Sequence, residues 1–139
     1  MTRTRVGAVA AALAMTTMVV GCATAKTPPV AATVCTDTQS GAGIVVALTS
    51  SPCPVVGGMT GSAQISVKDS SGTPIKDATV KVKYDMSSMS MHGSVDAAAS
   101  GEGYQARLLL SMGGTWDVTV EVTRGSAAPT DVHFSVTAK

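Results

Sequence analysis

Apolar and polar side chains alternate along most of the chain after residue 43. Val80, Val82 and Tyr84, for example, alternate with polar neighbours such as Lys81 and Lys83. A period of two places one kind of side chain on each face of a strand, so this pattern predicts half-buried β-strands. The segments that carry it, or that are β-branched or weakly strand-like, are 44–49, 63–68, 78–85, 94–98, 104–110, 116–122 and 132–136.

Turn signals separate these segments, as at Gly57-Gly58 and Gly113-Gly114. No segment after residue 43 shows the period of a helix. About seven short strands, each with one polar face, predict an all-β fold, namely an immunoglobulin-like antiparallel β-sandwich.

The first residues have the composition of an export signal. Arg3 and Arg5 precede an apolar stretch, 6–20, that Thr16 and Thr17 interrupt. This stretch is too short for a good membrane span, so residues 1–21 are predicted to be a signal peptide and no part of the fold.

The end of that stretch resembles the lipobox of bacterial lipoproteins. Aliphatic residues, Gly21 and Cys22 stand in the order in which such a cysteine becomes lipidated and forms the new N-terminus. We therefore expect Cys22 to anchor the protein to the cell membrane on its extracytoplasmic face. Ordinary secretion after cleavage near Ala23 or Ala25 is the alternative.

Residues 22–42 are rich in Thr, Ala, Pro, Ser and Gly and contain Pro28-Pro29. Such a composition buries too little apolar surface to offset the entropy of ordering it, which predicts a flexible, disordered tether. Residues 43–139 then form one β domain.

Charge and motifs argue against several functions. Without Arg3 and Arg5, eight Lys and Arg remain against nine Asp and Glu, and no basic stripe is present, so we expect no nucleic-acid partner. The chain lacks a nucleophile elbow, a His-Glu-x-x-His motif and a phosphate-binding loop. We therefore expect no enzymatic activity.

Two cysteines remain once Cys22 carries lipid. Cys35 and Cys53 form an even pair in an oxidising compartment, which predicts a disulfide between them. A thiolate metal site is the alternative interpretation.

A short segment concentrates soft ligands. Met86, Met89, Met91 and His92 lie within seven residues. Thioether sulfur is a neutral, soft ligand that suits Cu(I), and it cannot be lost to a disulfide. The segment indicates a copper site outside the cytoplasm, although methionine also fills irregular gaps in protein cores.

Strand alternation brings further methionines to this segment. If consecutive strands alternate in direction, the loops 50–61, 86–93 and 111–115 emerge at one end of the sandwich. Met59 and Met112 then join the segment there, Met59 as a peripheral ligand. Two or three thioethers with one imidazole would complete a Cu(I) site.

Four of these residues have a simpler interpretation, whereas packing explains Met89 and Met91 less well. Met86 and Met112 continue the inward-facing positions of their strands and could simply cover the core. His92 could be a solvated turn residue, and Met59 could fill a gap within its loop. Trp116 is expected in the core, where its indole could also shield a metal from water.

Four motifs carry a resemblance to a known family. The Gly72-x-Pro74 turn, the methionine segment, Gly103-Tyr104 and Met112-x-Gly114-x-Trp116 resemble the YtkA-like family, which is related to FixH-like domains. The resemblance implies an immunoglobulin-like domain outside the cytoplasm, associated with metal efflux and copper. Serines replace the Pro and Gly that commonly separate the family's methionines.

Together these observations predict a lipid-anchored, copper-binding protein, either a Cu(I) chaperone or an accessory of copper resistance and efflux. Its expected partners are the membrane, through Cys22, and a copper-efflux or cuproprotein-assembly protein. A cell-envelope module that binds another protein without metal is the alternative.

Overall fold

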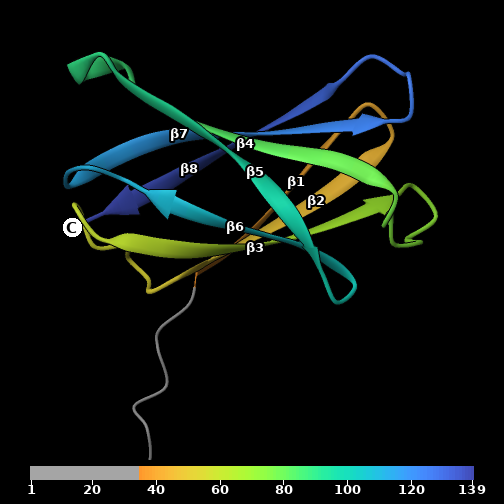
Figure 1. Cartoon of the computed structure of the whole chain (residues 1–139), viewed down its shortest axis with the longest axis horizontal. Coiled ribbons are helices and arrows are strands. Elements are labelled where there is room, and N and C mark those ends of the chain that lie inside the picture. The colour runs from red at the N-terminus through yellow and green to blue at the C-terminus, as the bar shows by residue number, and fades with distance from the viewer. Residues whose placement is uncertain (1–34) are drawn as a thin grey trace, which may run out of the picture.

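The computed structural model of the protein describes residues 35–139, which form an all-β domain (Figure 1). The elements in chain order are β1 (Cys35–Gly41), β2 (Ile44–Ser51), β3 (Thr60–Asp69), β4 (Ala78–Met86), the 3-10 helix η1 (Ser87–Met89), β5 (Met91–Ser100), β6 (Gly103–Leu109), β7 (Gly114–Arg124) and β8 (Thr130–Ala138). The all-β expectation is confirmed. The signal peptide and Cys22 lie outside the described residues.

The strands form one antiparallel sheet in the order β1-β2-β3-β6-β5-β4-β7-β8. β5 joins its two halves, because residues 91–97 of β5 border β4 whereas residues 98–100 pair with β6. In Figure 1 β5 crosses obliquely from one layer to the other. The edge strands β1 and β8 approach each other, so the sheet is nearly closed and resembles a sandwich.

The core lies between the two halves of the sheet and follows from the alternation in sequence. In β7, Trp116, Val118 and Val120 point inward and are almost completely buried. Each such side chain contributes about 1.5–3 kcal/mol relative to an exposed one. Among residues 35–139 there is no helix long and apolar enough to cross a bilayer.

One boundary differs from the sequence-based expectation. Residues 35–41, which we expected to belong to the flexible tether 22–42, form β1 and pair with β2 along its whole length. Six of the seven β1 residues are exposed, so no buried side chain marks this strand in the sequence. Backbone hydrogen bonding to β2 and the bond between Cys35 and Cys53 hold it instead.

Candidate functional site

Three loops meet at one end of the domain: 52–59, 87–90 and 110–113. The Gly58 N–H donates to the Leu110 carbonyl oxygen over 2.7 Å, which joins the first loop to the third. The Ser111 hydroxyl donates to the Met91 Sδ over 3.3 Å, which joins the third loop to the start of β5. The predicted convergence of these loops is therefore confirmed. We call these loops and the strand residues that flank them the methionine end.

Met86 and Met91 face each other at this end. They are directly opposite residues of β4 and β5 and lie on the inner face of the sheet. Met86 is only 5 % exposed, and Met91 is half-buried against the core. A Cβ at position 114 would lie 2.8 Å from Met86 Cε, so Gly114 leaves the space that the Met86 side chain occupies.

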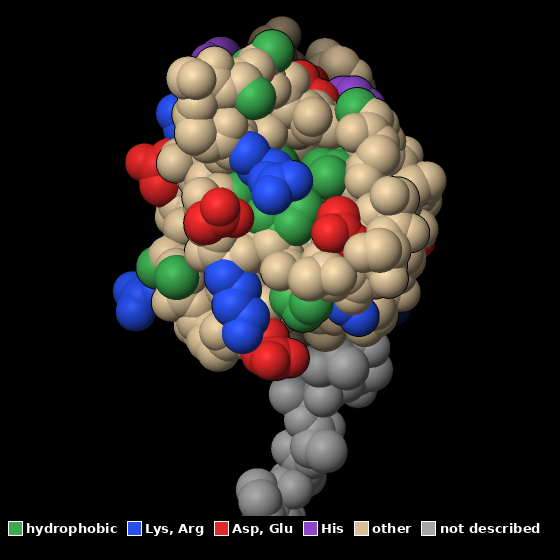
Figure 2. Space-filling view, turned by 90° about the vertical axis from the view of Figure 1, so that its right-hand side faces the viewer, with side chains coloured by type: hydrophobic (Ala, Val, Ile, Leu, Met, Phe, Trp, Pro, Cys, Tyr) green, Lys and Arg blue, Asp and Glu red, His purple; other side chains and the backbone are tan. Residues whose placement is uncertain are grey.

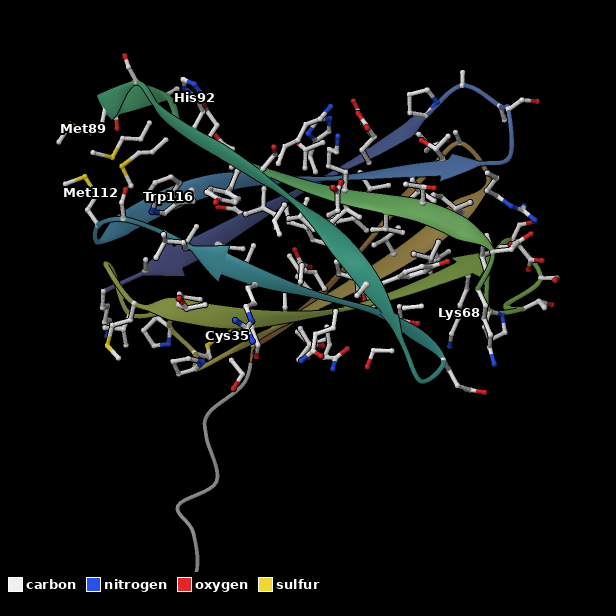
Figure 3. The ribbon with its side chains drawn as sticks, viewed as in Figure 1. Cys35, Lys68, Met89, His92, Met112 and Trp116 are labelled. Carbon is white, nitrogen blue, oxygen red and sulfur yellow. A yellow bond between two sulfur atoms is a disulfide. The ribbon has the colours of Figure 1, made fainter. Side chains whose placement is uncertain are left out.

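Met112 and Trp116 form the neighbouring wall. The Trp116 Nε1–H donates to the Met112 carbonyl oxygen over 3.1 Å, and the indole is 1 % exposed. Tyr84 packs edge-on against this indole, with ring centroids 6.1 Å apart. Met112 itself is half-buried against the core. Figure 3 shows sulfur atoms gathered between the labelled Met89, Met112 and Trp116.

Met89 and Met59 lie at the rim. Met89 ends η1 and is 54 % exposed, just before Ser90 reverses the chain with a left-handed φ of 53°. Met59 precedes β3 and is 62 % exposed. Met89 is thus an accessible thioether above the recessed ones, and Met59 is peripheral, as its position in the sequence suggests.

His92 lies apart from these sulfurs. It follows Met91 in β5, so the strand alternation turns it to the outer face, where it is exposed (Figure 3). There it lies opposite Asp85 of β4, which in turn lies opposite Asp117 of β7. All three line a shallow outer groove. We expected His92 to join the methionines, but the structure places it on the outer face, away from them.

The described part of the chain holds no cluster of the harder ligands His, Asp and Glu. Within residues 35–139 no three His, Cys, Asp or Glu side chains lie close enough together to hold a metal ion. Cys35 and Cys53 form the predicted disulfide, with their Cα atoms 5.4 Å apart, which removes both thiolates as ligands. The thioethers are therefore the soft candidate ligands at this end.

The methionine end is also free of charged loop residues. None of its three loops contains Lys, Arg, Asp or Glu. Lys139 is the charged residue beside them: its N–H donates to the Val55 carbonyl over 2.8 Å, its backbone oxygen accepts from the Gly57 N–H over 2.7 Å, and its side chain is exposed. By contrast, the outer face of β4 and β7 carries ion pairs such as Lys83–Glu121, whose hydrogen bond raises the pKa of Lys83.

Sequence reasoning missed two residues that shape this end. Ser111 bonds to the Met91 sulfur, and Gly93 of β5 lies beneath the Tyr84 ring, where a Cβ would overlap the ring atoms. Neither has a local signal in the sequence, because each contact depends on the pairing of strands. The sequence places Gly93 in the loop 86–93, and only its position in β5 shows it to be a strand glycine that marks a close approach.

A family model described as YtkA-like matches residues 38–121, which confirms the resemblance drawn from the motifs. No curated protein and no solved structure matches the chain. The matched range runs from β1 into β7 and includes every methionine of the described residues. The match therefore covers the strands and loops that form the methionine end.

Proposed function

Because this chain belongs to the YtkA-like family, as a β domain of an extracytoplasmic protein, we propose that it is a lipid-anchored protein that binds Cu(I) through thioether sulfurs. It would serve as a Cu(I) chaperone or as an accessory of copper resistance and efflux. Its partner would be a copper-efflux or cuproprotein-assembly protein. Cys22 would attach it to the membrane.

The observation that carries this proposal is the position of Met86, Met91 and Met112. They come from three different segments and lie at an end whose loops hold no charged side chain, beside a buried indole. Neutral sulfur ligands in an apolar setting favour a soft monovalent ion, whereas harder divalent ions need nitrogen or oxygen ligands. Met89 is the accessible thioether through which an ion could enter or leave.

The metal-free alternative rests on the same end. Met86 is buried like an ordinary core residue, and Val56 and Leu109 expose apolar surface nearby. A domain that only docks on another envelope protein would use these features without copper.

Cu(I) competition against a chelator distinguishes the two functions. The mature protein, kept under conditions that leave its disulfide intact, should bind about one Cu(I) per chain, with Cu(II) and Zn(II) bound much more weakly. Affinity should change little with pH, because thioethers carry no competing proton. The double change Met91→Leu and Met112→Leu keeps side-chain volume and should lower Cu(I) affinity at least about a hundredfold, while leaving the fold intact.

Two matched variants serve as controls. His92→Ala removes the imidazole on the outer face, and Met59→Leu removes the peripheral thioether, so each should retain most of the Cu(I) affinity. If the wild type cannot compete with the chelator, or if the double variant keeps full affinity, the metal-free docking module becomes the better account.

A further inference from the structure

The exposed large apolar side chains of the domain gather at one end. Within residues 35–139 they are Val56, Met59, Met89 and Leu109, each between 40 and 62 % exposed. Val56 and Met59 lie in loop 52–59, Met89 ends η1, and Leu109 ends β6. All four therefore lie at the methionine end. We call these four side chains the apolar rim.

The opposite end has a different surface. Figure 2 views the molecule from that side and shows Lys, Arg, Asp and Glu side chains around a small apolar centre. Lys76 and Glu102, from two of its turns, form an ion pair 3.4 Å long. The loops of the methionine end hold no charged residue. The opposite end therefore suits water, whereas the methionine end suits an apolar partner surface.

Cys35, the first described residue, lies in the half of the domain that carries the apolar rim (Figure 3). Cys35 begins β1 and is bonded to Cys53 in loop 52–59, next to Val56. Cys22, the proposed lipid attachment site, lies thirteen residues before Cys35. A fully extended chain of that length spans at most about 45 Å, so a lipidated Cys22 would keep the domain near the bilayer, with this end within reach of it.

We propose that the apolar rim rests in the membrane surface, with the methionine end facing the bilayer. This inference rests on the proposed anchor at Cys22 but not on copper. The anchor supplies the attachment, so the rim needs only a weak affinity for lipid to set the orientation, because tethering raises its effective concentration at the surface. The three loops hold no charged side chain and can enter the interface without removing charges from water, while the exposed Lys139 beside them can keep its amine at the level of the headgroups.

This orientation would place the recessed sulfurs against the membrane. A donor or acceptor of the ion would then be a membrane-embedded protein reached along the surface, not a freely diffusing one. A protein partner that covers the rim in place of lipid is the competing occupant, and pure lipid distinguishes between the two.

The methionines themselves report the orientation. Copper-free protein, anchored through lipidated Cys22 in nanodiscs of phosphatidylcholine and phosphatidylglycerol with nitroxide-labelled acyl chains, is measured by NMR of ¹³C-methyl methionine and alanine. The Met59 and Met89 methyl signals should lose several-fold more intensity than that of Ala127, an exposed residue of the opposite end. The double change Val56→Ser and Leu109→Ser should abolish this difference.

Ala128→Ser, which alters the opposite end, is the matched control and should leave the attenuation pattern unchanged. Equal attenuation at both ends, or a pattern that survives the double serine change, overturns the proposal. Absence of attenuation in pure lipid also overturns it and leaves the rim to a protein partner. The mass of the mature protein tests lipidation separately, and copper-free conditions keep this result independent of Cu(I) binding.

Discussion

Gly93 leaves the space in which the Tyr84 ring packs, and this ring supports the methionine end. Tyr84 lies directly opposite Gly93 in the pairing of β4 with β5, and the ring covers the space where a Cβ would stand. The same ring packs on Trp116, which bonds to the Met112 carbonyl. A side chain at position 93 would therefore shift the wall of the candidate copper site.

We expect Gly93→Ala to lower the free energy of unfolding by about 1–3 kcal/mol, because the added methyl group forces the Tyr84 ring out of its position. Urea denaturation, followed by the fluorescence of Trp116, measures the effect. Ser94→Ala, at the exposed neighbouring position, should change stability by less than about 0.5 kcal/mol. Equal effects of the two substitutions would contradict the ring contact.

Asp69 organises the turn between β3 and β4. Its Oδ1 accepts hydrogen bonds from the Ser71 hydroxyl and from the N–H groups of Thr73 and Ser71. The Ser71 hydroxyl, followed by the Thr73 N–H, holds the pKa of Asp69 below its ordinary value of 3.8. A depressed folded-state pKa adds stability above the unfolded-state pKa, and this stability is lost as the pH falls through the folded-state value.

The protein should therefore be more stable than its Asp69→Asn variant at pH 6, and this advantage should shrink as the pH falls below about 4. Denaturation of both proteins across that range tests the sign. Parallel stability curves for the two proteins would show that the carboxylate contributes nothing.

At the scale of elements, β1 is the strand with the least support from the core. Among residues 35–139 its one strand partner in the sheet is β2, and a hydrogen bond between the Thr36 and Thr49 hydroxyls links the side chains of the two strands. The disulfide ties the first residue of β1 to loop 52–59, eighteen positions along the chain. We infer that this bond keeps β1 from fraying.

Replacement of both Cys35 and Cys53 by serine should cost about 3 kcal/mol of stability, from the entropy that the open loop regains in the unfolded chain. Thermal unfolding measures the cost, and hydrogen exchange should show that protection is lost first in 35–41. Thiol titration of the unreduced wild type should find neither cysteine free. Uniform loss of protection across the sheet would contradict a local role.

At the scale of the whole molecule, the two ends of the domain's long axis differ from each other. Figure 1 shows the turns 70–77 and 125–129 at one end and η1 with the 110–113 turn at the other. Cys35, bonded to Cys53, lies in the half of the domain that carries the second of these ends (Figure 3). Attachment through Cys22 would therefore localise the domain with the apolar rim within reach of the bilayer.

We expect Cys22→Ala to move the protein from the membrane fraction to the soluble extracytoplasmic fraction, because it removes the site of the lipid. Fractionation of cells and detergent partitioning measure the change, with Cys35→Ser/Cys53→Ser as a cysteine control that should stay in the membrane. Unchanged membrane association of the Cys22 variant would exclude this anchor.

The amino-acid sequence by itself determined the fold class and most strand positions, because side-chain alternation in a strand is a local property. It also predicted that the loops bearing Met59, Met89 and Met112 meet, since alternating strand direction suffices for that. It missed β1, whose exposed side chains carry no alternation of apolar residues.

Only the tertiary structure decided which ligands share a face. η1 and the left-handed Ser90 start β5 at Met91 and pair it with Met86, so Met91 points inward and His92 outward. A shift of one residue would exchange the two, because strand side chains have a period of two. The sequence alone therefore could not show that the imidazole lies apart from the thioethers. The structure places the imidazole on the outer face and the thioethers at the methionine end.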